Sequence, residues 1–277
     1  MAEAAIQAKA QDINFVTKFT SDLHNLLTVL GKTEVQTMAA GTAFKIYKTT
    51  GTLNTATVAP KALIPDSNIG TDAGEIVTLD YSKYRNLTAI EDVQKKGYEV
   101  AVGASNSALL RDIQKGIRKS IFAALAKGTG EAKGSTFQAK VANTAAYLQK
   151  KFEDEACTPI LFANPEDAYE YLGSHTVTLE SLFGLNYLSR FIGIGNVIID
   201  SNVPKGTVYG TAAENIEVVS ASIAQISGME LTTDETGIIA VHNSIKYENA
   251  AFEVVAYTGL KVLPIYADRI VKTTTGV

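Results

Sequence analysis

The chain has 277 residues, of which 46 % are hydrophobic, so it can form a substantial core and is not a wholly disordered protein. The formal net charge of −4 excludes a surface that is basic throughout, and the single cysteine, Cys157, excludes an internal disulfide and suits a reducing compartment. The sequence has no apolar run of about 18 residues, and its start lacks the apolar stretch of a secretory signal, so we expect no membrane span and no signal peptide.

The pattern of residues 1–36 predicts an arm that contains a helix. Large apolar residues recur at helical spacing from Phe15 to Leu30, and Gly31 ends the pattern. The alanine-rich segment before Ile13 shows no partner of its own. The favoured interpretation is a frayed terminus followed by a packed helix. The alternative is an arm that docks on a neighbouring subunit.

Residues 49–74 predict a protruding arm. The flanking segments, 43–48 and 75–84, alternate apolar and polar residues, as half-buried strands do. The stretch between them is rich in Thr, Ala, Gly and Asn and carries few large apolar groups. Two strands that leave the body and return, with a polar tip between them, have little of their own to bury. We therefore expect this arm to be ordered when it lies on another molecule.

Residues 104–127 give the strongest helix pattern, with an apolar stripe from Leu110 to Leu125. Ser105, Asn106 and Ser107 are the candidate N-caps, and Gly128 follows the expected end. A second face of this helix is basic and consists of Arg111, Lys115, Arg118 and Lys119. This face is either an ordinary solvent-exposed helix surface, which we favour, or a contact for an acidic surface or phosphate.

The second half of the chain mixes helices and strands. A loop is expected at 128–136, a helix at about 137–153, a buried strand at 159–163, and a helix that starts with Asn164 as N-cap and Pro165 at its first position. Short strands follow at 196–200, 206–210 and 215–219, the first two joined by a turn at 201–206. Further strands are expected at 237–241, 252–257 and 260–263. The fold class is therefore α+β, with two lobes and a C-terminal segment that returns to the central helix.

The sequence shows no convincing catalytic, cofactor or metal site. The three histidines are far apart, and Cys157 with His175 is a weak candidate for a nucleophile and base because Cys157 lies at the start of a buried strand. The loop containing Lys133 has the wrong order for a phosphate-binding loop, and Gly193-Ile-Gly195 precedes a strand instead of following one.

Three stretches carry a resemblance to a known family. They are Phe162-Ala-Asn-Pro-Glu-Asp-Ala-Tyr169, which is similar to a strand followed by an Asn-Pro helix start; residues 196–209, similar to a hairpin of the axial lobe; and residues 250–264, similar to the terminal strands. With the order of the elements, they make the chain resemble the major capsid proteins of tailed bacteriophages, which have the Hong Kong 97-like fold.

The resemblance implies a division of the chain. Residues 1–36 would be the N-terminal arm, 37–95 the extended loop and its base, 96–135 the peripheral domain with its spine helix, 136–236 the axial domain, and 237–277 C-terminal strands returning to the peripheral domain. Lys61 lies in the loop where self-crosslinking members have a lysine, but no partner asparagine is identified, and we infer no crosslink.

The resemblance also implies a function. The chain would be a structural protein, without enzymatic activity or cofactors, that assembles into hexamers and pentamers of an icosahedral shell enclosing double-stranded phage DNA. A separate scaffolding protein and a portal would be its partners, it would contact packaged DNA non-specifically, and it would be assembled in the host cytoplasm and found in the virion. The alternatives are an encapsulin-type shell of a cellular compartment and a soluble α+β enzyme.

Overall fold

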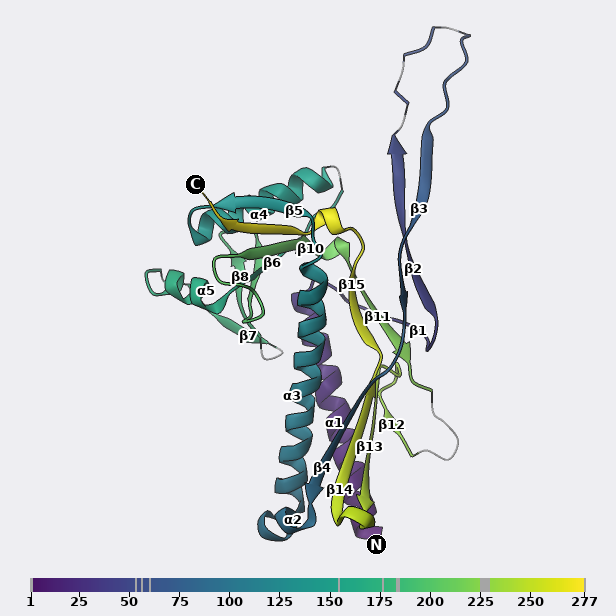
Figure 1. The fold of residues 1–277 in the computed structure, drawn as a ribbon, viewed down its shortest axis with the longest axis vertical. Coiled ribbons are helices and arrows are strands. Elements are labelled where there is room, and N and C mark those ends of the chain that lie inside the picture. Colours follow the sequence, from purple (N-terminus) through teal and green to yellow (C-terminus); the bar gives the residue numbers. More distant parts are fainter. Residues whose placement is uncertain are drawn as a thin grey trace.

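The computed structural model describes residues 2–52, 54–55, 57–59, 61–153, 155–175, 177–182, 185–224 and 230–276. Two long helices run side by side through the lower part of the molecule, and a narrow two-stranded ribbon rises away from the body (Figure 1). The N-terminus lies at the lower end and the C-terminus in the upper lobe, where a larger sheet sits beside the end of the second long helix (Figure 1).

The first helix, α1 (Ala2–Val29), begins before the predicted apolar stripe and packs against the chain itself. Its apolar face is almost fully buried, with Phe19 and Leu26 each 1 % exposed, as is Leu30 directly after the helix. Buried Asp12 accepts a hydrogen bond from the side chain of Asn243 (2.6 Å), which joins the early part of the helix to a C-terminal strand. The packed-helix interpretation is therefore confirmed for the described residues, whereas the expectation that the segment before Ile13 has no partner is wrong.

The central helix, α3 (Tyr98–Leu125), starts earlier than predicted, after the short helix α2 (Ile90–Lys96) and Gly97. The expected caps lie inside the helix, where Asn106 is buried and Ser105 Oγ accepts a hydrogen bond from Asn86 Nδ2 (2.9 Å). Three polar residues in sequence look like a cap, but here they lie within the helix, and Ser107 is exposed. The apolar stripe is confirmed, and Ile113 is fully buried.

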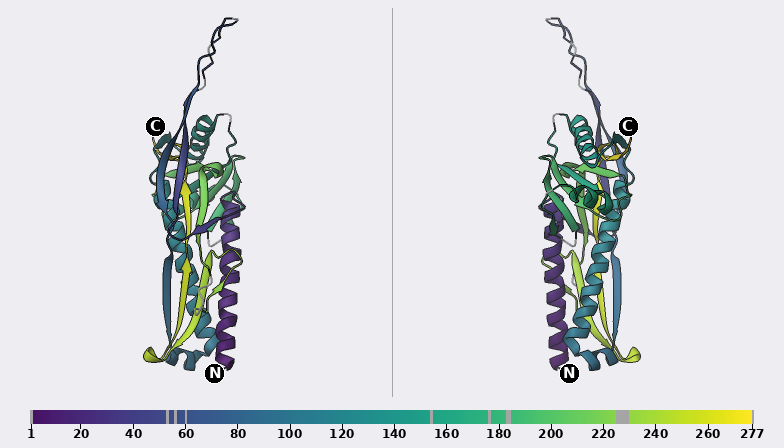
Figure 2. Two further views of the ribbon diagram at one scale, coloured as in Figure 1. Left: turned by 90° about the vertical axis from the view of Figure 1, so that its right-hand side faces the viewer. Right: turned by 90° about the vertical axis from the view of Figure 1, so that its left-hand side faces the viewer.

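A four-stranded sheet packs against the lower parts of α1 and α3. Its order is β12 (Thr232–Thr233), β13 (Ile239–Lys246), β14 (Ala251–Thr258) and β4 (Ser82–Ala89), with antiparallel neighbours. Both views in Figure 2 show α1 and α3 beside these strands. The predicted strand at 75–84 is wrong in its extent, because the chain turns at Leu79–Tyr81 and β4 then pairs with β14. Because β14 is distant in the sequence, no pattern within residues 75–84 indicates where one strand ends and β4 begins.

The upper lobe contains a seven-stranded mixed sheet in the order β5-β16-β10-β6-β9-β8-β7. Its strands are β5 (Gly130–Gly134), β16 (Val271–Thr275), β10 (Val208–Ala212), β6 (Pro159–Ala163), β9 (Gly195–Ile199), β8 (Leu185–Phe191) and β7 (Glu180–Leu182). The predicted hairpin at 196–209 is wrong, because β6 lies between β9 and β10 and pairs with both. The predicted loop at 128–136 is also wrong, since β5 pairs in parallel with β16.

Both faces of this sheet are buried, and β6 shows how. Leu161 and Ala163 face a cluster under helices α4 (Phe137–Phe152) and α5 (Pro165–Leu172), while Ile160 and Phe162 face the main core. Gly210 on β10 allows a close approach there, because a Cβ at this position would lie 2.1 Å from Thr144 Cγ2 of α4. Both helices were predicted. Asn164 Oδ1 accepts from the Glu166 amide, as expected for the N-cap of α5, and the structure adds Thr136 Oγ1 as the cap of α4.

The C-terminal half of α3 connects the lobes. Phe122 meets Phe162 of β6 edge to face, with ring centroids 5.4 Å apart, so one core spans α1, α3 and the inner faces of two sheets. A small three-stranded sheet of β1 (Gln36–Ala39), β11 (Ile216–Ser222) and β15 (Leu260–Pro264) lies between them. Short 3-10 helices complete the chain at Ala213–Asn215, Tyr247–Asn249 and Ala267–Arg269.

The sheets modify the domain division that the resemblance implied. Strands β5 and β16 were expected in the peripheral domain, but both belong to the seven-stranded sheet of residues 130–275. Conversely, β12, expected in the axial domain, pairs with β13 of the four-stranded sheet. A sheet gathers strands from distant parts of the chain, so continuous residue ranges do not describe these lobes.

Candidate assembly surfaces

The ribbon of β2 (Ala43–Thr52) and β3 (Asn68–Thr78) forms a sheet of its own that no other described strand joins. It rises beyond the body as a thin pair of strands (Figure 1). Its base is anchored where Phe44 packs near buried Leu79 and where Lys261 Nζ donates to the Thr78 carbonyl (2.7 Å). The strand pair predicted at the arm is confirmed, and the ten residues of β2 span about 33 Å.

One face of the ribbon carries exposed apolar side chains. The register pairs Lys45 with Ile76 and Gly51 with Ile69, so both isoleucines lie on the same face as Tyr47. Tyr47, Ile69 and Ile76 are 58 %, 54 % and 56 % exposed. At the tip, Leu63 and Ile64 are also exposed. Exposed apolar residues aligned on one face of an isolated two-stranded ribbon are typical of a contact surface.

The predicted basic face on α3 divides into two parts. Arg111, Lys115 and Lys119 are exposed, as expected for either interpretation of that face. Arg118 is different: its side chain is 20 % exposed and its Nε lies 3.8 Å from Oδ2 of buried Asp200, which follows β9. Arg118 therefore helps join α3 to the seven-stranded sheet, and three of the four cations remain as an open surface.

The weak catalytic candidate has no supporting geometry. Burial and the nearby Glu214 carboxylate raise the pKa of Cys157 to about 11, so the thiol stays protonated at neutral pH. His175 lies elsewhere, stacked on Tyr171 with ring centroids 4.1 Å apart, and its Nδ1 contacts Ser174 Oγ. Lys133 lies in strand β5 instead of a phosphate-binding loop. Among the described residues, no three His, Cys, Asp or Glu side chains are grouped so that they could hold a metal ion.

Two carboxylates form ion pairs that hold neighbouring parts of the fold together. The guanidinium of Arg269 makes two hydrogen bonds to Glu155 (2.6 and 3.0 Å), which lowers the pKa of that carboxyl and raises that of Arg269. Burial alone would raise the pKa of Glu253, but hydrogen bonds and ion pairs with Arg85 and Lys246 hold it below its usual value. These contacts connect neighbouring elements and offer no reactive group.

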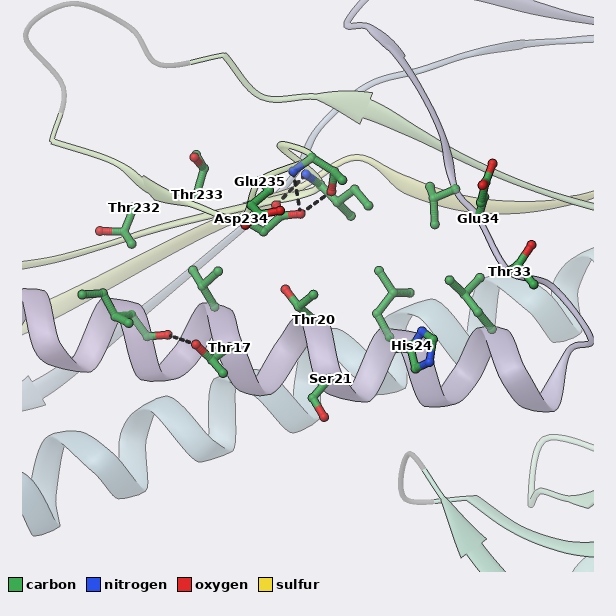
Figure 3. Close-up of a pocket in the computed structure, with 17 residues that line it drawn as sticks. Thr17, Thr20, Ser21, His24, Thr33, Glu34, Thr232, Thr233, Asp234 and Glu235 are labelled. Atoms are coloured by element: carbon green, nitrogen blue, oxygen red, sulfur yellow. Dashed lines mark hydrogen bonds between the residues drawn. The ribbon is translucent and has the colours of Figure 1, made fainter.

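A groove between α1 and the segment after β12 was not predicted (Figure 3). It has a volume of about 880 Å³ and runs along α1 from Ile13 to Leu27. The opposite wall comes from residues 232–236, and Thr33, Glu34 and Val35 close one end. Because its walls come from segments some 200 residues apart, no local sequence pattern could have revealed it.

Among the described helices, none is long and apolar enough to cross a membrane.

Comparisons with known proteins identify the fold family that the chain resembles in structure. No family model matches the chain, and no curated protein matches it in sequence. The chain is similar in structure to a virus-like particle from Pyrococcus furiosus, with a TM-score of 0.56, 14 % identity and coverage of 96 % of this chain and 97 % of that chain.

Two further solved structures extend this likeness. The capsid of a native GTA particle matches with a TM-score of 0.60 and 9 % identity, covering 91 % of this chain and 90 % of that one. The holo-SrpI encapsulin complex from Synechococcus elongatus PCC 7942 matches with a TM-score of 0.53 and 9 % identity, covering 87 % and 84 %. With further phage capsids among the matches, these similarities show that the chain has the Hong Kong 97-like fold of capsid proteins.

Proposed function

We propose that this chain is a shell-forming structural protein, the major capsid protein of a tailed bacteriophage. It would assemble into hexamers and pentamers of an icosahedral shell that encloses double-stranded DNA. The observation that carries the proposal is the ribbon, whose exposed apolar face has no partner among the described residues of its own chain, on a fold shared with capsid proteins. A shell supplies the missing partner from a neighbouring subunit.

The remaining partners follow from the same proposal. A separate scaffolding protein and a portal would act during assembly in the host cytoplasm, and the finished shell would be part of the virion. The exposed cations Arg111, Lys115 and Lys119 would contact the DNA backbone without reading its sequence. The chain would have no enzymatic activity and no cofactor.

A compartment shell of the encapsulin type is the second candidate. The match to an encapsulin complex over 87 % of this chain supports it. The two candidates differ in content: nuclease-resistant DNA inside particles purified from the native source supports the capsid, whereas an enclosed protein supports the compartment.

Deleting residues 52–71 tests the central claim. The deleted stretch adds nothing to the described core clusters, so circular dichroism should show an unchanged fold, while electron microscopy and sedimentation should show no particles. Normal particles from the deleted protein would refute the proposed role of the ribbon. Loss of the fold would show that the stretch belongs to the core.

A milder variant separates apolar contact from ribbon length. Replacing Tyr47, Ile69 and Ile76 together by threonine keeps strand-forming residues but removes the apolar face. We expect assembly to require a higher protein concentration. Thr71→Val is the matched control. Thr71 lies on the same strand and face of the ribbon as Ile69 and Ile76, and the substitution adds apolar surface instead of removing it.

A further inference from the structure

Asn106 is a buried polar group without partners at the contact between α1 and α3. Its side chain is 6 % exposed, and neither Nδ2 nor Oδ1 has a hydrogen-bond partner among the described residues. Other buried polar side chains of these two helices are paired. Gln114 donates to Asp22 (2.7 Å), and Asp12 accepts from Asn243 (2.6 Å). A buried amide without partners is costly for its donor and for its acceptor, so Asn106 calls for an occupant that supplies both.

A cavity of about 420 Å³ lies beside Asn106, between α1 and α3, on a different face of α1 from the groove of Figure 3. Its volume is within the usual range of small-molecule pockets, about 300–1,000 Å³. Both helices rise from the lower end of the molecule (Figure 1), and the Asp22–Gln114 hydrogen bond fixes their register. Eight residues earlier on each helix, Asn14 and Asn106 therefore stand at the same level and line the cavity from its two walls.

The walls carry neutral polar side chains that both donate and accept hydrogen bonds, namely Gln11 and Asn14 of α1 and Asn106 and Ser107 of α3. Like Asn106, the other three make no side-chain hydrogen bond with any described residue. Lys18 and Glu99 add opposite charges that cancel, and Phe15 and Leu110 form an apolar base. A Cβ at Gly103 would meet no atom within 4 Å, so α3 leaves open space beside this base.

These groups define the chemistry of the ligand. A metal ion would satisfy Oδ1 of Asn106 and leave Nδ2 without an acceptor, and an anion would do the reverse. A single carboxamide would pair with one asparagine and leave the opposite wall unsatisfied. A sugar ring carries hydroxyl groups around its rim, each of which donates and accepts. Two neighbouring hydroxyls can therefore pair with Oδ1 and Nδ2 of one asparagine, while the C–H face of the ring packs on the apolar base.

We propose that this cavity binds a neutral sugar of one or two rings, with two neighbouring hydroxyls on Asn106 and the remaining hydroxyls on Asn14, Gln11 and Ser107. The amide of Asn106 lies below the cavity surface, so its side chain turns into the cavity when the sugar binds. This binding is a property of the single subunit and does not depend on the proposed shell. A free sugar and the end residue of a glycan share this chemistry.

The test is saturation-transfer NMR of the full chain with D-glucose, D-galactose and D-mannose, and with L-glutamine as the carboxamide control. We expect at least one hexose to bind with a dissociation constant below about 10 mM and about tenfold or more tighter than glutamine. A disaccharide that ends in this hexose separates the two sources: equal binding indicates the end of a glycan, and weaker binding indicates a free sugar. Absence of hexose binding in this range, or equal binding of glutamine, would overturn the proposal.

Variants of α3 locate the binding. Gly103→Leu places a side chain in the open space and should weaken hexose binding about tenfold or more, whereas Ala104→Leu, at an exposed position outside the lining, should leave it within about twofold. Asn106→Leu keeps a similar side-chain volume and removes both unpartnered atoms, so it should abolish binding and raise the urea midpoint of unfolding.

Two results would contradict the site. Hexose binding that survives Gly103→Leu would place the sugar outside the cavity, and an Asn106→Leu variant that binds like the native chain would remove the role of Asn106. A purely structural role of Asn106 would change the urea midpoint and leave hexose binding intact. Ser107→Leu repeats the steric test if circular dichroism shows that Gly103→Leu has not folded.

Discussion

The carboxyl of Asp12 is buried between α1 and β13, and it makes the docking of α1 sensitive to pH. Asp12 is 4 % exposed, and burial raises its pKa to about 6 from an ordinary value of 3.8, although the hydrogen bond from Asn243 and the charge of His242 oppose the shift. Burial raises the pKa of Tyr98 at the start of α3, and the charge of the Asp12 carboxylate raises it further. Asp12 is therefore the group whose replacement tests the packing of α1 most directly.

The sign of the effect follows from linkage. Because the folded pKa of Asp12 lies above the unfolded value, the folded state binds the proton more tightly, and stability falls as pH rises from about 4 to about 6. The full shift would correspond to about 3 kcal/mol at neutral pH. The amide that replaces the carboxylate in an Asn variant is itself a buried polar group, so the expected net gain from the substitution is smaller, about 1–2 kcal/mol.

Asp12→Asn should remove this cost. The amide carries no charge, and its Oδ1 can still accept from Asn243 Nδ2. We expect the free energy of urea unfolding to rise by about 1–2 kcal/mol at pH 7.5 and to change by less than about 0.5 kcal/mol at pH 4. Asp112→Asn, on the exposed face of α3, is the control and should change stability by less than about 0.5 kcal/mol at both values. A variant that is less stable than the native protein at pH 7.5 would refute the reasoning.

Three further substitutions follow from the packing. Gly116→Ala should raise the free energy of urea unfolding by up to about 1 kcal/mol, because alanine favours the helix and the added methyl lies 3.1 Å from the Tyr84 hydroxyl, which can move. If α3 must bend when assembled shells expand, the same substitution should slow that expansion. Unchanged expansion would leave packing as the only role of this glycine. Leu148→Ala should cost about 2–5 kcal/mol because Leu148, on the inner face of α4, is fully buried, and a cost below about 1 kcal/mol would contradict that packing. Arg118→Met should cost about 1–3 kcal/mol by leaving Asp200 buried without this partner, whereas Lys115→Met, on the open face, should change the melting curve little; equal effects would mean that the ion pair contributes nothing.

The sequence by itself determined the elements that are set by neighbours along the chain. The apolar spacing of α4, the cap at Asn164 and the stripe of α3 involve residues within a few turns of one another, so they were predicted correctly. The ribbon was also predicted, because the polar composition between two alternating segments leaves little to bury. Arg111, Lys115 and Lys119 are exposed, as the local pattern of α3 predicted for the whole face, whereas Arg118 is half-buried.

Only the tertiary structure decided the features that depend on distant partners. The polar segment 130–134 becomes a strand because β16 lies beside it, and β9 and β10 are separated because β6 inserts between them. Arg118 is a structural contact instead of a free cation because Asp200 is brought to it by the upper sheet. The groove exists because α1 lies against residues 232–236. Strand pairing and helix docking of this kind depend on which surfaces the whole chain buries together. No single segment therefore carries a periodic pattern that reveals them.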